Sequence, residues 1–236
     1  MSINSIFAQQ SYFNVPSSDK TKKDDFFFQQ QVNYADNEFT SNSTLDWGIT
    51  DHFEMGMNVL QVNYLSGHVL RISDQDISEN EMIYPLITLN AQYFVPLAEG
   101  HQLSLGAISG FSFLNEFSWN ENASLAFLNY QYRSEKIKLT SGLYTGNNHM
   151  FAQGTRFILP NIDTKIGLQI GCEVPILHEK LSMIADYFSG THAWGVSTLG
   201  LAVEVPHHWI VSLGGFFPNF KSHNPTGIVF ELTRAL

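Results

Sequence analysis

Hydrophobic and polar positions alternate with a period of two along most of the chain, most clearly between Thr164 and Trp209. In the stretch KIGLQIGCEV, one parity is apolar and comprises Ile166, Leu168, Ile170, Cys172 and Val174. The other parity is polar or glycine and comprises Lys165, Gly167, Gln169, Gly171 and Glu173. Because successive side chains of a strand point to opposite faces, this pattern predicts strands with one apolar and one polar face.

The same alternation recurs from residue 25 to residue 236, and helical periodicity is nearly absent. The predicted strands are 25–34, 39–49, 53–64, 84–95, 102–113, 123–133, 136–144, three within 164–205, 209–217 and 227–236. They number twelve when 145–163 is treated as a loop. The parity blurs near Leu60, which predicts a bulge or an apolar contact with the interior.

The connections between these segments alternate in length. One set is short and comprises 50–52, 96–101, 134–135, 176–180 and 206–208. The other set is longer on average and is led by 66–82 and 145–163. Short turns on one side and long loops on the other are typical of bacterial membrane barrels. The pattern predicts an all-β fold: a closed antiparallel up-and-down transmembrane β-barrel of about twelve strands over residues 25–236, with both termini on the periplasmic side.

Composition agrees with a lipid-facing surface. The chain has 19 Phe, 9 Tyr and 4 Trp but only 14% charged residues, and it has no apolar run of the roughly 18 residues that a membrane helix needs. The net charge of −10 argues against a nucleic-acid partner, because phosphate binding needs a basic patch. The single cysteine, Cys172, excludes an intrachain disulfide, and no Cys/His zinc pattern is present. We therefore predict no metal and no cofactor.

The N-terminus suggests export. Residues 1–8 (MSINSIFA) followed by Gln9 look like the remnant of a secretory signal peptide, with a small residue at the expected cleavage point. The stretch resembles the export signals of Bacteroidota-type bacteria. Residues 9–24 are polar and include Pro16 and the Lys20–Lys23 cluster, and we interpret them as a periplasmic N-terminal lead-in.

The span from about 25 to 236 resembles the small outer-membrane β-barrel proteins of Gram-negative bacteria. The phrases that carry the likeness are VPILHEKLSMIADYFSG, GVSTLGLAVEVPHHWIVSLGGFFPN and the terminal GIVFELTRAL. The resemblance implies location in the outer membrane and insertion by the barrel-assembly machinery, which reads the last strand. Such strands usually end on an aromatic residue, whereas this one ends on Leu236 with Phe230 six positions earlier.

Charged residues on the polar parity are predicted to line the lumen. They are Asp46, Glu54, Lys138, Lys165, Glu173, Asp186, Glu204 and Glu231. Two interpretations stay open: a salt-bridge network that fills the lumen, or a narrow pore that prefers cations. Twelve strands lie between filled barrels of eight and open channels of sixteen or more. We expect a lumen that is partly open or plugged by residues 145–163.

The sequence offers little support for any catalytic group. His207 and His208 are neighbours in a turn, so a shared metal is not expected, and His149, His178 and His192 fall in predicted loops where solvation is expected. An outer-membrane phospholipase would show a His shortly followed by Ser-Asn-Gly, and the sequence has no such run. Asp186 and His192 lie near one rim, where we expect a structural role. No catalytic residue is predicted.

The leading functional hypothesis is an outer-membrane barrel that acts as a passive channel or small-solute uptake protein. The alternative is a structural or accessory barrel with a plugged lumen that binds partner membrane proteins. An outer-membrane enzyme and a soluble secreted β-sandwich are the two remaining alternatives. The expected partners are outer-membrane lipid and a small solute.

Overall fold

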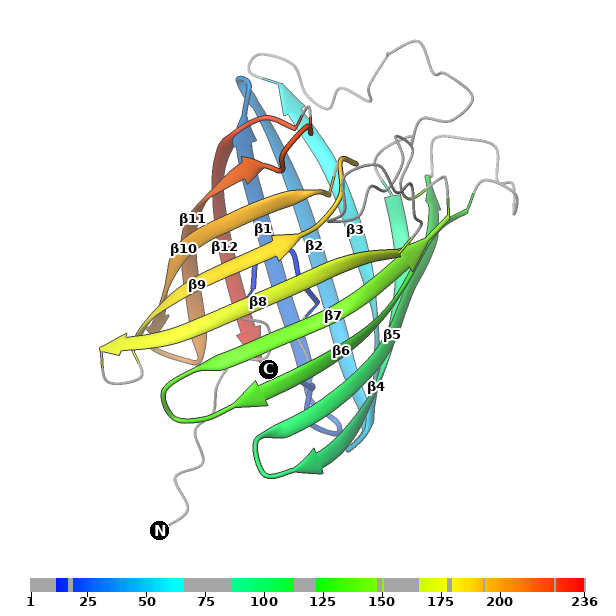
Figure 1. Cartoon of the computed structure of the whole chain (residues 1–236), viewed down its shortest axis with the longest axis vertical. Helices are drawn as coiled ribbons and strands as arrows, with labels where there is room; N and C mark the ends of the chain where they lie inside the picture. Colours follow the sequence, from blue (N-terminus) through cyan, green and yellow to red (C-terminus); the bar gives the residue numbers. More distant parts are fainter. Residues whose placement is uncertain are drawn as a thin grey trace.

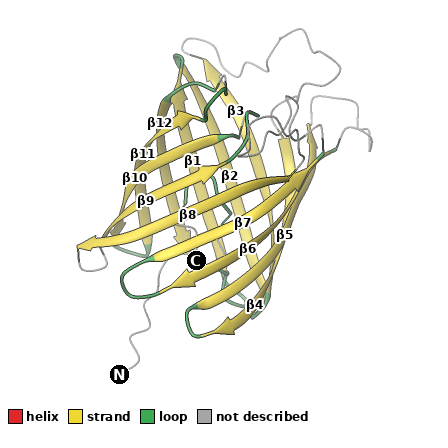
Figure 2. Ribbon diagram, viewed as in Figure 1, coloured by secondary structure: helices red, strands yellow, loops and turns green. Residues whose placement is uncertain are grey.

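The computed structural model describes residues 12–16, 19–65, 86–112, 122–147, 150, 166–177, 180–192, 194–222 and 224–235. These residues form twelve strands in one closed antiparallel barrel, as predicted (Figure 1). The strands are β1 Phe26–Ala35, β2 Glu38–Thr50, β3 Phe53–Leu65, β4 Leu86–Ala98, β5 His101–Ser112, β6 Ala123–Arg133, β7 Lys138–Gly146, β8 Ile166–Leu177, β9 Leu181–Phe188, β10 Val196–Val205, β11 Trp209–Pro218 and β12 Gly227–Ala235. Figure 2 shows strands joined by turns. Among the described residues, no helix is long and apolar enough to cross a membrane.

Each strand pairs with its neighbours in sequence, and β1 closes the barrel against β12. The closing register runs from Phe27 opposite Ala235 to Tyr34 opposite Ile228. Closure matters because a free strand edge would expose unpaired backbone groups, which hydrocarbon cannot satisfy. We call the end where β1 begins and β12 ends the terminal rim, and the opposite end the loop rim.

The described turns at the terminal rim are short, as expected, and span 51–52, 99–100, 134–137 and 206–208. The tight β1–β2 turn lies at the loop rim. Its central residues Asp36 and Asn37 have φ angles of 50° and 64°. Two adjacent left-handed residues are the signature of a type I′ hairpin turn, which Asp and Asn tolerate better than most residues. Residues 66–85 and 151–165 lie outside the described part of the chain.

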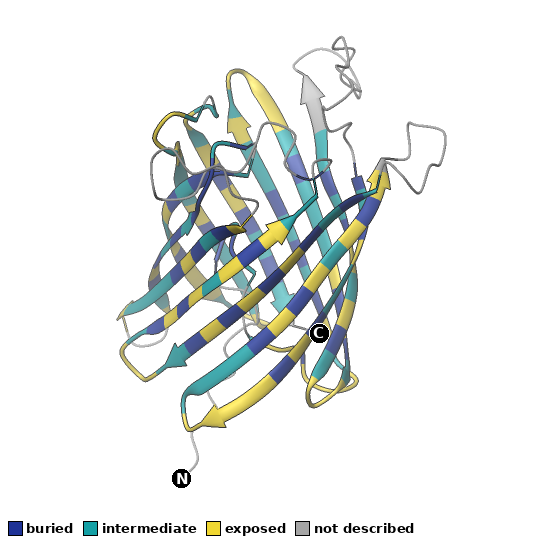
Figure 3. Ribbon diagram, turned by 45° about the vertical axis from the view of Figure 1, so that its right-hand side comes forward, coloured by how far each residue is buried: buried dark blue, intermediate teal, exposed yellow. Residues whose placement is uncertain are grey.

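The outer face is apolar, and buried and more exposed residues alternate along much of the barrel wall (Figure 3). Leu105, Leu213 and Ile228 are each more than half exposed, although their side chains are aliphatic and hydrophobic. Aromatic pairs sit near the strand ends: Phe26 stacks on Trp47 near the terminal rim, and Tyr34 packs on Phe39 near the loop rim. An apolar band between aromatic girdles is the surface that a transmembrane barrel presents to lipid.

The irregularity predicted near Leu60 is confirmed. The register between β2 and β3 shifts between Ser41 and Ser43, so that one extra residue enters β3. Gln61 takes a φ of 54°, and the Leu60 side chain is only 6% exposed. Leu60 has the inward parity of Glu54 and Asn58, so it makes the apolar interior contact, and the extra residue of the bulge follows at Gln61.

The main surprise is the segment that precedes β1. We call residues 12–16 and 19–24 the luminal segment (Figure 1, dark blue). Tyr12, Phe13, Val15 and Thr21 are at most 3% exposed, and Lys22 to Asp24 are exposed at the terminal rim. Sequence analysis described residues 9–24 only as a periplasmic lead-in and did not expect them to enter the barrel.

The lumen is therefore more apolar than predicted. Tyr12, Phe13 and Val15 join a cluster of inward-facing wall residues. The wall members are Leu60, Leu86, Ala123, Leu125, Phe127, Tyr144, Ile184, Phe188, Ala202 and Val229, with Met150 from the loop after β7. These apolar residues occupy positions of the inward parity, so they follow the strand periodicity but break the expected polarity of the inner face.

Candidate functional site in the lumen

The structure places most of the predicted luminal charges on the inner face. Asp46, Glu54, Lys138, Asp186 and Glu231 are each at most 8% exposed. Glu173 is only slightly more exposed, at 12% of its side chain.

Two residues of the predicted set differ. Glu204 has the inward parity but is exposed, because it lies one residue from the end of β10, where the wall meets solvent. Lys165 lies outside the described residues. Their part in a conduction path stays a prediction.

Uncharged polar side chains complete the wall between these charges. Gln29 donates to Glu231, and Gln169 donates to Asn129 Oδ1 over 2.5 Å. On the other side, Asn58 donates to Thr88 over 3.0 Å. Such chains of amides and hydroxyls satisfy buried polar groups that would otherwise be costly.

One end of the luminal segment is anchored by Asn14. Its backbone N–H donates to Asp186 Oδ2 over 2.7 Å, and its side-chain amide donates to Asp186 Oδ1 and to Thr198 Oγ1. These partners come from β9 and β10. A carboxylate that accepts both a backbone and a side-chain donor fixes position and orientation together.

The wall is hollowed where the two aromatic rings of the segment lie. A Cβ atom added to Gly171 would lie 2.7 Å from the Tyr12 ring, and one added to Gly214 would lie 3.0 Å from the Phe13 ring. Glycine at these positions therefore lets the rings approach the backbone of β8 and β11. The Tyr12 hydroxyl also accepts from Thr140 Oγ1 over 3.2 Å.

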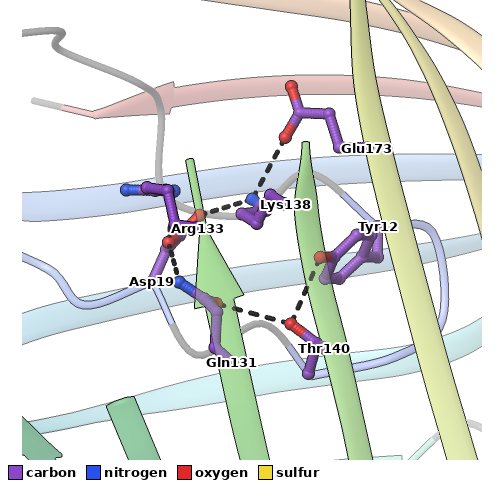
Figure 4. A network of polar contacts seen from close by, with 7 residues as sticks. All are labelled: Tyr12, Asp19, Gln131, Arg133, Lys138, Thr140 and Glu173. Carbon is purple, nitrogen blue, oxygen red and sulfur yellow. Dashed lines mark hydrogen bonds and ion pairs between the residues drawn. The ribbon is translucent and has the colours of Figure 1, made fainter. Parts of the chain in front are cut away.

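The other half of the segment is held by ion pairs around Asp19 (Figure 4). Asp19 Oδ1 lies 2.5 Å from Arg133 Nη2, and Asp19 Oδ2 lies 2.5 Å from Lys138 Nζ. Gln131 Nε2 donates to the same carboxylate over 3.0 Å. Lys138 also pairs with Glu173 at 3.2 Å.

This environment decides the charge state of Asp19. Burial by itself would raise the pKa of Asp19, but the Lys138 ammonium and the Arg133 guanidinium offset it. The pKa of the carboxyl group therefore lies below its ordinary value. Asp19 is an anion clamped between two cations of β6 and β7.

Beyond Asp19 the segment reaches the opposite wall. The backbone N–H of Thr21 donates to Glu54 Oε2 over 2.7 Å, and Asp24 donates its N–H to the Gly48 carbonyl over 2.8 Å. These partners belong to β3 and β2. Since β3 and β9 are six strands apart in a closed ring of twelve, the segment crosses the bore from wall to wall.

A cavity of about 400 Å³ lies beside the segment. It extends from Asp36 and Glu38, which are exposed near the loop rim, down to Asp19 and Thr21 of the segment. Its carboxylates are Asp19, Asp36, Glu38, Asp46 and Glu54. Among its described lining residues there is no Lys, Arg or His.

The remaining lining groups are carboxamides and apolar side chains. The carboxamides are Asn14, Gln29, Gln31, Asn33, Asn42, Asn58, Gln61, Asn90, Gln92 and Asn224. Phe127, Trp194 and Phe216 are among the aromatic residues of the wall. Such a surface offers both donors and acceptors to a hydroxylated solute and a negative field to a cation.

The prediction that His192 is solvated is wrong. His192 is 1% exposed, and its Nε2 lies 2.8 Å from the Tyr144 hydroxyl, which also donates to the Ser189 carbonyl. Burial lowers the pKa of His192 to about 4. The loop between β9 and β10 folds inward over Tyr144, and a period-two pattern does not report such loop packing.

Asp186 and His192 do not form a catalytic pair, since Asp186 binds Asn14 while His192 binds Tyr144. Within the described residues, no group of three or more His, Cys, Asp or Glu side chains is placed to hold a metal ion. Cys172 is a free thiol with the parity of Ile166 and Ile170, which face outward. His149 and His178 lie outside the described residues.

Sequence reasoning missed the luminal segment, although two signals were present. Tyr12, Phe13 and Val15 interrupt an otherwise polar stretch, and inward-facing glycines such as Gly171 and Gly200 leave room in the wall. Neither signal is specific when read separately. The expected plug, residues 145–163, lies largely outside the described residues.

No protein-family model and no curated protein matches the sequence. Solved structures do share the architecture. The KdgM porin superposes with a TM-score of 0.57 at 8% identity, covering 89% of this chain and 99% of that one. The NanC porin gives 0.56 at 5% identity, covering 88% and 97%. At such identities the likeness concerns the fold alone: the chain has the twelve-stranded barrel fold of outer-membrane porins.

Proposed function

We propose that this protein is an outer-membrane barrel that admits small cationic or neutral solutes through its lumen, with both termini on the periplasmic side. The apolar outer belt and the porin-like fold support membrane residence. The observation that carries the proposal is the cavity at the loop rim, which has five lining carboxylates and no basic side chain among its described lining residues.

The physical argument concerns the field inside the cavity. Carboxylates in a narrow space with low-dielectric walls raise the local concentration of cations and repel anions. Three of them, Asp36, Glu38 and Asp46, form no ion pair with a basic side chain of the described residues, whereas Asp19 is paired with Arg133 and Lys138. Carboxamides around them can replace part of the hydration shell of an entering solute.

The test is ion selectivity in planar bilayers. Under a salt gradient the full-length protein should give discrete conductance steps whose reversal potential has the sign of cation selectivity. Asp46→Asn, which removes a charge from the cavity wall, should reduce that selectivity. Glu135→Gln removes an equal charge from the exposed turn between β6 and β7, outside the cavity, and should leave the selectivity unchanged. Anion selectivity in the unaltered protein would overturn the solute class.

A second function is favoured by a different observation. Because the luminal segment crosses the bore, the barrel also suits an accessory role in which a blocked lumen supports binding of partner membrane proteins. Such a barrel would show no conductance steps, with the segment or without it. We infer no enzymatic role, since Asp186 and His192 are committed to different partners.

A further inference from the structure

We propose that the inner wall carries a binding site for an extended peptide, and that the chain's own residues 12–21 occupy it as an autoinhibitory plug that docks and undocks as a unit. The inference rests on the proposed channel function, because a plug regulates only a lumen that conducts. Three features of the described residues carry it.

The first feature is the path of the segment. Asn14 is anchored on β9 and β10, whereas Thr21 is anchored on β3, on the opposite side of the ring. Between them, the Pro16 carbonyl accepts from Asn129 on β6 over 2.9 Å. The segment also contributes Phe13, Asn14, Pro16, Asp19 and Thr21 to the lining of the cavity, so it forms part of the boundary that a solute meets.

The second feature is that the wall is shaped for particular side chains. The three atoms nearest to a Cβ added at Gly171 all belong to the Tyr12 ring, at 2.7 to 2.8 Å, and none belongs to the wall itself. At Gly171 the inner face thus has a recess into which the Tyr12 ring fits. A recess that matches an aromatic ring, together with ionic anchors for an acid seven residues later, defines a peptide-recognition surface.

The third feature is that three of the wall groups that hold the segment also have a partner within the wall. Lys138, which binds Asp19, also pairs with Glu173 at 3.2 Å. Gln131, which donates to Asp19, also accepts from Thr140. Asn129, which donates to Pro16, also accepts from Gln169. Because these three wall groups keep a second partner, departure of the plug leaves none of them unpaired, whereas Asp186 and Glu54 lose the donors supplied by Asn14 and Thr21.

The first experiment compares the full-length protein with a variant that lacks residues 12–21, in planar bilayers. We expect the deletion to raise open probability by about tenfold or more, the change expected when a docking equilibrium of ordinary strength is lost. A synthetic peptide of residues 9–24, added to the deleted barrel, should restore the block. The same peptide with Asp19→Asn should block less well.

The second experiment uses the full chain, in case the deletion impairs folding. Gly171→Ala should raise open probability, because the three atoms nearest to the new methyl group belong to the Tyr12 ring, at 2.7 to 2.8 Å. Gly215→Ala is the matched control, since its Cβ would approach the Phe217 ring no closer than 3.4 Å. In the deleted barrel, Gly171→Ala should have no effect on conductance.

The outcomes separate the two proposals. Equal open probability in the full-length protein, the deletion and Gly171→Ala would overturn the plug but leave the channel function standing. Absence of steps in all of these would overturn the channel function itself. Peptide that fails to block a conducting deleted barrel would show that the wall has no peptide-binding site.

Discussion

At the scale of single residues, Asp19 has the strongest interactions in the luminal segment. Its side chain is 6% exposed and lies between Arg133 and Lys138, of which Lys138 is also buried. Removing one partner from a buried ion pair lowers stability by about 3–5 kcal/mol, because the remaining charge is buried without a partner. Here the Lys138–Glu173 contact at 3.2 Å reduces that cost on the wall side.

A pH dependence of plug docking follows from this residue. Docking lowers the pKa of Asp19, so its stabilising contribution is complete above the ordinary value of about 4 and is lost as pH falls through the lowered pKa. Open probability, recorded from pH 7 to pH 3, should therefore rise at the acid end. The Asp19→Asn protein should lack this component of the profile, and an unchanged profile in that variant would assign the effect to other carboxyl groups.

His192 supplies a second pH effect, on the barrel itself. Burial lowers its pKa to about 4 in the folded protein, against about 6.5 when unfolded. Between pH 6.5 and pH 4 the His192 side chain is therefore protonated in the unfolded chain but not in the folded protein. The free energy of unfolding falls as pH drops through this range, by about 3 kcal/mol at most. Urea unfolding in lipid vesicles at pH 7 and pH 5 measures this loss. His192→Asn, which cannot titrate, should show a smaller difference between the two pH values.

At the scale of elements, backbone conformation at the turns and bulges determines which residues fit. Asn37 has a φ of 64° and ends a hairpin turn between β1 and β2. Gln61 has a φ of 54° at the bulge in β3. Left-handed backbone is strained for β-branched residues in particular, so these two positions constrain the local sequence more than their exposure suggests.

Substitutions at Asn37 test that constraint. Asn37→Val should lower the free energy of unfolding by about 1–2 kcal/mol relative to Asn37→Gly, because glycine adopts the left-handed conformation without steric cost. Both variants lose the 3.2 Å hydrogen bond from the Tyr34 hydroxyl to Asn37 Oδ1, so the comparison isolates the backbone term. Urea titration of the two proteins gives the difference, and equal midpoints would contradict it.

At the scale of the whole molecule, the outward apolar side chains require a hydrocarbon solvent. Leu213 is 58% exposed at the middle of β11, and Leu97 is 54% exposed near the terminal-rim end of β4. In water both would be equally tolerant of a charge. In a bilayer, depth matters, because the penalty for a charged side chain is greatest at the midplane and small near the interface.

Arginine substitutions at these two positions distinguish a membrane barrel from a soluble one. Leu213→Arg should lower the free energy of unfolding in lipid vesicles by about 2–4 kcal/mol, and Leu97→Arg by about 0–1 kcal/mol. The unaltered protein should also need detergent and migrate differently on a denaturing gel before and after boiling. Equal tolerance of both arginines would favour a soluble barrel and contradict the membrane assignment.

The sequence by itself determined the strand count, the order of the turns and the face of most side chains. It could do so because the period of two is a local property: Leu45, Asp46 and Trp47 alternate whatever lies across the barrel, and β2 shows them exposed, buried and exposed in turn. The position of the bulge at Leu60 was likewise visible as a break in parity. Inward placement of the charges followed from the same rule.

Only the tertiary structure decided what fills the lumen. The contacts of Asn14 with Asp186 and of Asp19 with Lys138 join residues more than a hundred positions apart, and no local pattern encodes such pairs. The burial of His192 has the same origin, since its partner Tyr144 lies on a distant strand. Periodicity specifies the direction of a side chain, whereas the occupant of an enclosed space depends on which distant groups closure of the ring brings together.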